Sequence, residues 1–467
     1  MSKPIHAYKQ AYFLGIGGIG MSAICRYFIS IGMDVFGYDK TQTPLTAALE
    51  DEGAKITYED SVSSIPQNIK NNLSETLFVF TPAIPKDHEQ FNWLKNNGIP
   101  IFKRSEVLGI ISKSMYCIAV AGTHGKTTTS SLIAHILYEA NVNFTAFLGG
   151  ISTNFGTNYI RKTDGINLLK QEIVVIEADE FDRSFHQLTP SSGIITAIDP
   201  DHLDIYETKE NFTLAFEQFT HLFKGEKPCV YIQEGVKIEA SKAIENRTYG
   251  LLNTSNYVIQ DTQIVNHQFL FKLVENNTVL GKIKCGLPGF HNVSNATAAA
   301  ALCYHSLQLD FLTIANGIES FKGVKRRFEI VYKSDEYTVI DDYAHHPEEL
   351  NAIISSVKAQ YPNTPICGIF QPHLFSRTRD FANGFAEALS QLSEIILMEI
   401  YPARELPIPG ITSTWLLSLI IHPNKSVQNT EEILTKIKMQ KPKVLLTLGA
   451  GDIDKIVPQI RTIYEQN

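Results

Sequence analysis

Short apolar runs alternate with longer segments of helical periodicity along almost the whole chain. Runs of this kind lie at 11–14, 76–84, 116–120, 172–179, 193–199, 337–342, 366–370, 394–398 and 444–448. Because stretches long enough for helices separate these runs, the pattern favours mostly parallel β-sheets flanked by helices. Between about 228 and 286 the runs become shorter and are interrupted by polar residues, which predicts an antiparallel section.

The order of these runs divides the chain into three α/β domains. A length of 467 residues accommodates about three domains of ~150 residues each. The first domain, at 1–113, and the last, at 322–467, are expected to be Rossmann-like with parallel sheets. The central domain, at 114–321, contains the interrupted section and ends before the basic segment 322–327.

The composition is that of an ordinary globular protein, with 44% hydrophobic and 19% charged residues. A formal net charge of −8 and the lack of a basic tract argue against a nucleic-acid partner. No run approaches the ~18 apolar residues of a membrane-spanning helix. The six cysteines are scattered without a C-x-x-C pair, so we expect reduced thiols, no membrane partner and a cytoplasmic location.

A glycine turn joins the apolar run 116–120 to a helix-like segment that contains 130–137, and it spans the sequence AGTHGKTTT at 121–129. The backbone N–H groups of such a turn face an anion, a lysine reaches the terminal phosphates, and a hydroxyl ligates Mg²⁺. We therefore predict a central P-loop-type ATPase domain. Its expected ATP contacts are Gly122, Thr123, His124, Gly125, Lys126, Thr127 and Thr128. The spacing departs from the usual P-loop, and an ordinary glycine turn is the alternative.

A second glycine turn, Gly15-x-Gly17-x-x-Gly20, follows the first apolar run, and Asp39 stands about 20 residues further on. This is the dinucleotide fingerprint, in which the glycines admit a diphosphate and the acid binds a ribose. The match is only moderately specific, so it favours a nucleotide with a diphosphate more than it favours NAD. A glycine turn without a ligand is the alternative.

Acidic side chains follow two neighbouring runs of the central domain. They are Glu177, Asp179, Glu180 and Asp182 after the first run, and Asp199, Asp201 and Asp204 after the second. Carboxylates at the carboxyl ends of parallel strands, near a phosphate loop, are the hard oxygen ligands that Mg²⁺ bound to ATP requires. His202 lies within the second group and is either a further ligand or a structural histidine.

Polar side chains also gather at a helix start and at two strand ends towards the C-terminus. Asn292 and Asn295 lie three residues apart on one helix face, where one can cap the helix and the other can contact an adenine. Asp342, Tyr343 and His345 follow the run at 337–342, and Arg377 and Arg379 follow the run at 366–370. Arginines at such a position suit a carboxylate or a phosphate, although Arg379 can equally form a surface ion pair.

With these motifs in this order, the chain resembles the Mur ligases from about residue 11 to the C-terminus. The strongest signatures are GIGGIGMS, GTHGKTTT, EADEFDRSF, DPDHLD, HNVSNA, KRRFE, DDYAHHP and QPHLFSRTRD. The resemblance implies an ATP-dependent amide ligase that joins L-alanine to the lactyl carboxylate of UDP-N-acetylmuramate through an acyl phosphate, in cytoplasmic peptidoglycan precursor synthesis. It implies that the UDP-sugar binds the first domain, ATP with two Mg²⁺ ions the central domain, and L-alanine the third.

The resemblance also assigns roles to individual residues. Lys126, Arg327 and His345 would be catalytic, with Arg327 on the γ-phosphate. Asn295 would face the adenine and Asp342 the ribose of ATP, while Thr127 and Glu177 would hold one Mg²⁺ and His202 the other. The UDP-sugar contacts fall on Gly17, Gly18, Ile19, Gly20, Asp39, Thr81 and Asn158, and the amino-acid contacts on Tyr343, His345, Arg377 and Arg379.

The sequence departs from the family pattern at two places. Many relatives carry a carbamoylated lysine near the second metal, whereas the segment 211–219 contains no lysine. We therefore expect no carbamate and name Glu217 or bulk water as the substitute. Leu374 stands where the family often has a basic residue, which weakens the assignment of amino-acid contacts at that point.

Three other interpretations compete with this one. A recycling ligase of the same superfamily attaches an intact peptide, an NAD-dependent oxidoreductase would use only the first domain, and a non-catalytic nucleotide switch would use ATP to regulate a partner. The oligomeric state, the preference among L-alanine, L-serine and glycine, and the proton acceptor for the amine are left open by the sequence. Product analysis with alanine and with a tripeptide separates the two ligases, and absence of NAD binding ends the oxidoreductase hypothesis.

Overall fold

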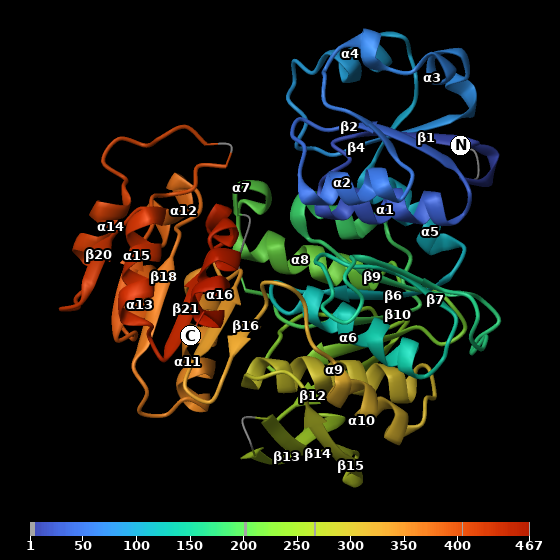
Figure 1. Cartoon of the computed structure of the whole chain (residues 1–467). Helices are drawn as coiled ribbons and strands as arrows, with labels where there is room; N and C mark the ends of the chain where they lie inside the picture. Colours follow the sequence, from blue (N-terminus) through green and yellow to red (C-terminus); the bar gives the residue numbers. More distant parts are fainter. Residues whose placement is uncertain (1–4, 200–202, 266–267, 404, 467) are drawn as a thin grey trace. The chain divides into compact units, whose positions relative to one another are not determined.

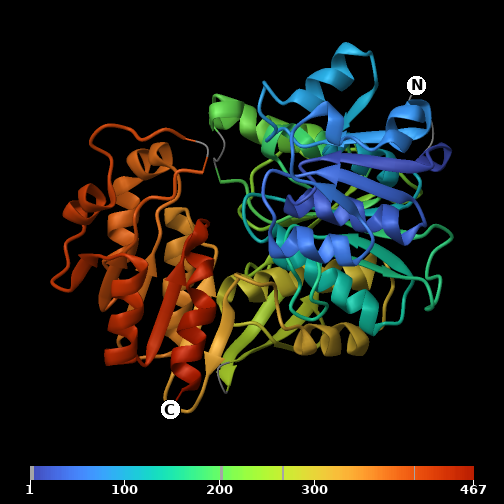
Figure 2. The ribbon, with the colours of Figure 1, turned by 45° about the horizontal axis from the view of Figure 1, so that its top comes forward.

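The computed structural model describes residues 5–199, 203–265, 268–403 and 405–466. These residues form three sheets, of five, ten and six strands, which are flanked by helices (Figures 1 and 2). The chain divides into two compact units. The first unit contains 1–263, 270–285 and 294–322, and the second unit contains 264–269, 286–293 and 323–467. The predicted α/β class with mostly parallel sheets is confirmed.

The first sheet belongs to the first unit and is parallel throughout, in the order β3-β2-β1-β4-β5. Its strands are β1 (Gln10–Leu14), β2 (Asp34–Tyr38), β3 (Lys55–Thr57), β4 (Thr76–Phe80) and β5 (Ile101–Lys103). The accompanying helices are α1 (Ile19–Ser30), α2 (Pro44–Asp51), α3 (Gln67–Asn71), α4 (Glu89–Asn96) and α5 (Arg104–Lys113). The strand order reverses between β1 and β4, and open α/β sheets bind ligands beyond the strand ends at such a point. The glycine turn after β1 lies there.

The second sheet has the order β15-β14-β13-β12-β11-β10-β6-β9-β7-β8. Its strands are β6 (Tyr116–Ala121), β7 (Phe144–Phe147), β8 (Tyr159–Lys162), β9 (Ile173–Glu177), β10 (Ser192–Ile195), β11 (Cys229–Gln233), β12 (Glu245–Gly250), β13 (Tyr257–Val265), β14 (Gln268–Glu275) and β15 (Thr278–Cys285). Its helices are α6 (Lys126–Glu139), α7 (Leu203–Tyr206), α8 (Lys209–Thr220), α9 (Phe290–His305) and α10 (Phe311–Ser320). Since β6 pairs in parallel with β9 and with β10, the turn after β6 is flanked by the ends of both neighbours.

The segment 228–286, predicted to be antiparallel, contains both strand directions. β11 and β12 continue the parallel sheet, because β11 pairs in parallel with β10, and β12 pairs in parallel with β11 and with β13. A tight hairpin then joins β14 to β15 through Asn276 and Asn277, with φ values of 46° and 68°, as a type I′ turn requires. The prediction was wrong for β11 and β12, since polar residues mark exposure along a strand and do not report its direction.

One apolar core joins the first sheet to the second within the first unit. It includes Phe13 of β1, Phe28 of α1, Val174 of β9 and Phe216 of α8, all of them fully buried. α5 packs on β6 and on the short helix η4 (Phe181–Gln187) that follows β9. The first two sheets therefore form one compact unit.

A buried polar contact accompanies this core. Arg26 on α1 pairs with Glu52 at 2.8 Å and donates to Oδ1 of Asn158 at 2.5 Å. Nδ2 of Asn158 donates in turn to the carbonyl of Ile19 and to the hydroxyl of Ser22. Asn158 is fully buried and stands directly before β8, so its amide attaches the second sheet to the start of α1.

The second unit contains the third sheet, in the order β16-β17-β21-β18-β19-β20. Its strands are β16 (Glu329–Lys333), β17 (Thr338–Asp342), β18 (Ile366–Phe370), β19 (Glu394–Leu397), β20 (Lys425–Val427) and β21 (Val444–Leu448). Its helices are α11 (Pro347–Gln360), α12 (Phe375–Asp380), α13 (Ala382–Leu389), α14 (Ser413–Leu419), α15 (Thr430–Gln440) and α16 (Val457–Glu465). β16 is antiparallel to β17, whereas the other pairs are parallel.

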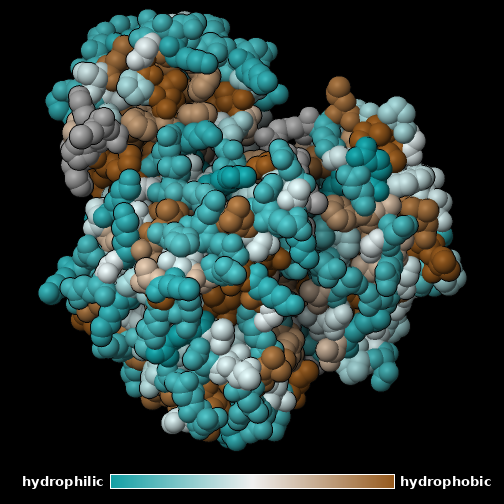
Figure 3. Space-filling view, turned by 180° about the vertical axis from the view of Figure 1, so that it is seen from behind, coloured by the Kyte–Doolittle hydropathy of each residue, from teal (hydrophilic) through white to brown (hydrophobic). Residues whose placement is uncertain are grey.

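Hydrophilic side chains predominate on the face shown in Figure 3, and hydrophobic ones form small groups between them. Scattered apolar residues of this kind are normal on the surface of a globular protein. Among the described residues, no helix combines the length and the apolar character needed to cross a membrane.

We expect Asn158→Ala to lower the stability of the first unit by about 2 kcal/mol, because Arg26, Ser22 and the carbonyl of Ile19 lose their buried partner. Of the two tryptophans, Trp93 lies in the first unit and Trp415 in the second. Urea unfolding followed by fluorescence in a Trp415→Phe background therefore reports on the first unit. Asn96→Ala, an exposed change on α4, is the control. Equal midpoints for the two variants would contradict the buried role of Asn158.

Candidate active site

The turn after β6 has a backbone that favours glycine at two positions. Gly122 has a φ of 128° and Gly125 a φ of 81°, both in the left-handed region. A Cβ atom on Gly122 would collide with Thr196, and one on Gly125 would lie 2.6 Å from Oδ1 of Asn295. Gly125 is the N-cap of α6, so the unpaired N–H groups of the first helical turn border this loop. The geometry is that of an anion-binding turn.

The segment after β10 holds this turn in place. The N–H of Thr123 donates to the carbonyl of Ala197, and the Thr123 hydroxyl accepts the N–H of Asp199, both at 2.9 Å. The hydroxyl of Thr196 donates to the carbonyl of His124. The predicted ATP contacts therefore lie in one continuous turn and helix start, namely Gly122, Thr123, His124, Gly125, Lys126, Thr127 and Thr128. Asn295 lies beside this turn.

Lys126 is held by a buried carboxylate of the acidic segment after β9. Its Nζ lies 2.8 Å from Oε1 of Glu180 and 2.6 Å from the carbonyl of Gly122. Glu180 is only 2% exposed. Burial alone would lower the pKa of Lys126, but Glu180, Asp179 and Glu177 outweigh it and raise that pKa above its ordinary value. Lys126 is therefore a fixed positive charge at the start of α6.

Thr127 and Glu177 meet next to this lysine. The hydroxyl of Thr127 donates to Oε1 of Glu177 at 3.0 Å, and the N–H of Gly149 donates to Oε2 at 2.9 Å. Neighbouring ligands of an octahedral Mg²⁺ ion lie about 2.9 Å apart, given metal–oxygen distances of 2.0–2.1 Å. The two oxygen atoms that the sequence assigns to the first Mg²⁺ therefore fit one edge of its coordination shell.

The other predicted metal groups have different partners. Asp179 pairs with Arg104 at 3.2 Å, and Asp182 pairs with Lys103 at 2.8 Å. The carboxylate of Glu217 accepts the backbone N–H of Glu239 at 2.9 Å. This contact does not support the suggestion that Glu217 replaces a carbamate. His202 lies outside the described residues.

The glycine turn after β1 gathers the residues predicted to contact a UDP-sugar. The N–H of Gly17 donates to Oδ2 of Asp39 at 2.7 Å, and a Cβ on Gly15 would lie 2.6 Å from the methyl of Thr81. Gly18 is the N-cap of α1, Ile19 and Gly20 begin that helix, and a Cβ on Gly20 would lie 2.5 Å from the guanidinium of Arg104. Asn158 approaches the same turn through its bond to Ile19, although its amide is buried.

A second cluster forms at the carboxyl end of β17, within the second unit. The guanidinium of Arg327 lies 5.2 Å from the ring centre of Tyr343, and the rings of Tyr343 and His345 lie 5.3 Å apart. Glu349, one helical turn after His345, accepts its N–H at 2.9 Å and lies 3.2 Å from its Nδ1. The other oxygen of Glu349 lies 3.8 Å from Arg327. Glu349 therefore faces both predicted catalytic groups of this unit.

The backbone around Arg327 has two residues in the left-handed region. Arg326 has a φ of 60° and Phe328 a φ of 49°, values that are strained for residues other than glycine. The carboxylate of Asp342 accepts the N–H of Phe328 at 2.6 Å and that of Ala344 at 2.8 Å. Both oxygens of the predicted ribose ligand Asp342 thus also support the backbone beside Arg327.

The two arginines of α12 differ in their surroundings. Arg377 is partly buried and its charge contributes to lowering the pKa of His345, after the larger effect of burial. Arg379 is exposed and pairs with its neighbour Asp380 at 2.7 Å, which is the alternative that the sequence left open. Leu374 adopts a φ of 69°, and the preceding His373 stacks on Tyr401.

Two charged residues of these clusters, Arg104 and Glu349, were not predicted from the sequence, and the partner role of Glu180 was not predicted either. Arg104 follows β5 without any motif, and Glu349 lies inside a helical segment. Glu180 was included only as one of four neighbouring acids, and nothing in the sequence indicated which of them pairs with Lys126. The one feature of the sequence that could have indicated Glu349 is its position four residues after His345 at a helix start, because residues at this spacing lie next to each other on a helix.

Three models of one protein family match consecutive stretches of the chain. The Mur ligase family catalytic domain matches residues 10–116, the Mur ligase middle domain matches 120–303, and the Mur ligase glutamate ligase domain matches 326–451. The chain belongs to the Mur ligase family and has its three-domain α/β fold.

Within this family the chain is similar over nearly its whole length to UDP-N-acetylmuramate–L-alanine ligases. It is 43% identical over 460 residues to that of Christiangramia forsetii, with 98% of each chain covered. It is 44% identical over 462 residues to that of Cytophaga hutchinsonii, covering 98% of this chain and 97% of the relative. The solved structure of UDP-N-acetylmuramate–alanine ligase from Thermotoga maritima matches with a TM-score of 0.80 at 30% identity, covering 98% of this chain and 99% of that one.

The stability of the second unit should depend on the protonation of Asp342. Burial raises the pKa of this carboxyl from 3.8 to about 6, against the opposing effects of Arg327 and two backbone N–H groups. Since the folded pKa is raised, the folded state binds this proton more tightly, and the contribution of Asp342 to stability falls as the pH rises from about 4 to about 6. We expect a loss on the order of 2 kcal/mol over this range.

Urea unfolding at several pH values, followed by Trp415 fluorescence in a Trp93→Phe background, measures this loss. Asp342→Asn should remove this contribution, so the stability difference between the variant and the wild type should change with pH by this amount, whereas Asp341, His291 and His345 titrate in both proteins. The exposed change Asp335→Asn should retain the pH dependence of the wild type. A stability difference between Asp342→Asn and the wild type that stays constant with pH would show that another group titrates.

Proposed function

We propose that this chain is an ATP-dependent ligase that joins L-alanine to the lactyl carboxylate of UDP-N-acetylmuramate in peptidoglycan precursor synthesis. The observation that carries this proposal is the convergence of Lys126, Thr127 and Glu177 at the start of α6, directly after the glycine turn. The choice of substrates rests on the full-length similarity to UDP-N-acetylmuramate–L-alanine ligases. We also propose domain boundaries at 113 and 321 and a cytoplasmic location.

ATP would supply the γ-phosphoryl group that turns the lactyl carboxylate into an acyl phosphate. The N–H groups at the start of α6 and the charge of Lys126 face the position where a phosphate would bind, and they are already oriented before it arrives. Such preorganised donors stabilise negative charge as it moves between oxygen atoms. Asn295, beside Gly125, would contact the adenine. The assignments of Arg327 to the γ-phosphate and of Asp342 to the ribose remain predictions.

Mg²⁺ would bind through Thr127 and Glu177, whose oxygen atoms lie 3.0 Å apart, and would neutralise part of the phosphate charge. The N–H of Gly149 donates to the other carboxylate oxygen of Glu177 and so orients this side chain. A second ion with His202 as ligand is a further proposal that rests on the sequence motif.

The UDP-sugar would bind at the glycine turn after β1, through Gly17, Gly18, Ile19, Gly20, Asp39 and Thr81. Arg104 approaches this turn at Gly20 and offers a cation for the diphosphate. Because the amide of Asn158 is fully buried and bonded to α1, we assign it the role of positioning this turn.

The amino acid would bind near Tyr343, His345 and Arg377, where Arg377 can pair with its carboxylate. Burial, the first cause, together with nearby arginines lowers the pKa of His345 below its ordinary value, against the opposing charge of Glu349. His345 is then neutral near pH 7 and able to accept a proton from the ammonium group of alanine. Arg379 is exposed and pairs with Asp380, so the structure gives no support to its predicted contact with the amino acid.

Phosphate release from Mg²⁺–ATP should require both UDP-N-acetylmuramate and L-alanine, and the product should gain the mass of one alanine residue. This measurement also separates the competing functions. Product formation with L-Ala-γ-D-Glu-meso-diaminopimelate and not with alanine would favour a peptide-recycling ligase. ATP binding without turnover of any amine would favour a nucleotide switch.

We expect Glu349→Gln to lower kcat by about 10- to 100-fold, because the uncharged amide holds His345 and Arg327 less firmly. The KM for ATP should change little. Since Glu349 raises the pKa of His345, its removal should shift the acidic limb of the kcat/KM profile to lower pH. Glu348→Gln, an exposed change next to it on α11, is the matched control. An unshifted profile would show that Glu349 has only a structural role.

A further inference from the structure

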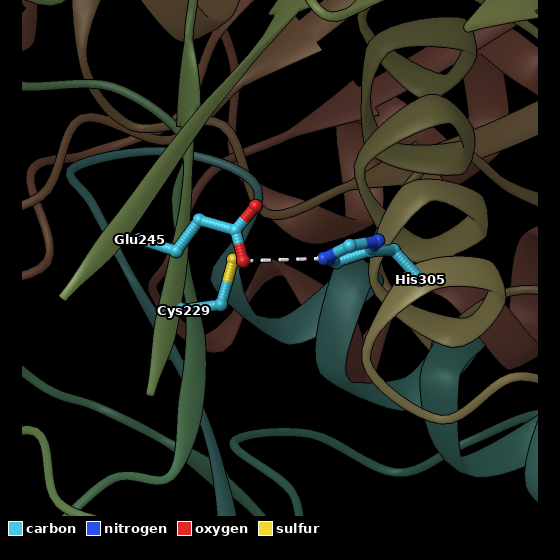
Figure 4. A group of neighbouring side chains, drawn as sticks. All are labelled: Cys229, Glu245 and His305. Carbon is cyan, nitrogen blue, oxygen red and sulfur yellow. Dashed lines mark hydrogen bonds and ion pairs between the residues drawn. The ribbon is translucent and has the colours of Figure 1, made fainter. Parts of the chain in front are cut away.

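A cysteine, a glutamate and a histidine from three elements of the first unit meet on one face of the second sheet. They are Cys229 on β11, Glu245 on β12 and His305, the last residue of α9 (Figure 4). One ligand atom from each, namely Sγ, a carboxylate oxygen and a ring nitrogen, lies within 4.8 Å of the other two. None of these three residues belongs to the clusters assigned to the ligase reaction.

The fold itself produces this convergence. Cys229 and Glu245 are register partners in the parallel pair β11–β12, so their side chains emerge next to each other on the same face. α9 brings His305 to that face, with Nε2 3.3 Å from Oε2 of Glu245. Ligands bound to zinc at 2.0–2.3 Å in a tetrahedron are about 3.3–3.7 Å apart. The histidine–glutamate pair already has this spacing, and the sulfur lies within 4.8 Å of both partner atoms.

The local charges also suit a cation. Arg247 pairs with Oε1 of Glu245 at 2.8 Å and with Glu275 at 3.1 Å, so one guanidinium faces two carboxylates. Oε2 of Glu245 remains directed at His305, and the C-terminal end of α9 adds a partial negative charge. A thiol and an imidazole favour a soft or borderline ion over Mg²⁺.

The group has both a buried and an accessible side. Cys229 is 2% exposed. The side chains of His305 and Glu245 are 30% and 45% exposed, which provides an entry path and room for a water molecule as fourth ligand. A metal-bound cysteine is a thiolate, so a bound ion would displace the proton of the Cys229 thiol.

We propose that Cys229, Glu245 and His305 form a second metal site, which binds a thiophilic divalent cation such as Zn²⁺ with a water molecule as fourth ligand. The site lies at the starts of β11 and β12, whereas the phosphate loop follows the end of β6. α9 connects the two regions, because Asn295 touches the phosphate loop at Gly125 and His305 stands about 15 Å further along the helix. A bound ion would fix the far end of this helix to the sheet.

Titration of the full-length protein with Co²⁺ and Cd²⁺ in excess Mg²⁺ tests this proposal. The wild type should bind one equivalent, with the visible spectrum of four-coordinate Co²⁺ and a thiolate-to-metal charge-transfer band for Cd²⁺, and Zn²⁺ should displace both. Cys229→Ser should abolish the charge-transfer band. His305→Ala and Glu245→Gln should each weaken binding at least tenfold.

Two control variants address the other histidines and thiols. His221→Ala, at an exposed position directly after α8, and Cys303→Ser, a buried change on α9, should bind the ions as the wild type does. Circular dichroism and ATP binding verify that each variant is folded. Because Glu245 and His305 are partly exposed, their variants remain informative even where Cys229→Ser is unstable. The proposal would be overturned if the wild type did not bind these ions, or if His305→Ala and Glu245→Gln bound them with the affinity of the wild type.

Discussion

The buried ion pair between Lys126 and Glu180 is the interaction on which the geometry of the phosphate loop depends. The Lys126 side chain is only 13% exposed, and a largely buried ammonium group needs a counter-charge, because an isolated buried charge is strongly destabilising. Glu180 is itself fixed, since the hydroxyl of Tyr206 donates to its backbone carbonyl at 2.6 Å. The acidic segment after β9 thus organises the glycine turn after β6, and the two motifs act as one structural element.

The parallel order of the second sheet makes this contact possible. β6 lies between β9 and β10, so the glycine turn, the acidic segment and the residues after β10 all emerge at one edge. The segments after β9 and β10 then contribute different groups to the site. β9 supplies Glu177 and Glu180, which face Thr127 and Lys126, whereas the segment after β10 supplies the backbone and hydroxyl groups that hold Thr123. Strand order therefore decides which side chains meet, and the local sequence decides what they can bind.

The sequence was sufficient to predict the parallel sheets and the two glycine turns, because apolar runs and glycines report local conformation directly. The phosphate-loop motif also named Thr127, and the family resemblance named Glu177, whose carboxylate accepts the Thr127 hydroxyl at 3.0 Å. The pairing of Lys126 with Glu180 could not be predicted, because four acids stand within six residues and only the backbone path selects one of them. The predicted antiparallel direction of β11 and β12 was wrong for a similar reason, because the exposure of a strand's residues is independent of the strand's direction.

The segment around Arg327 shows how strain and hydrogen bonding combine at a residue for which we propose a functional role. Left-handed φ values at Arg326 and Phe328 cost about 1–3 kcal/mol each and persist only where the surroundings impose them. Asp342 imposes one through the N–H of Phe328, and Glu329 imposes the other through the N–H of Arg326 at 2.8 Å. The guanidinium of Arg326 is engaged with Asp341 and with the carbonyl of Gly449, so this arginine anchors the segment to the third sheet. Both guanidinium groups lie 5.2 Å from the ring centre of Tyr343, but that of Arg327 pairs with Glu349, so the two adjacent arginines differ in their charged partners.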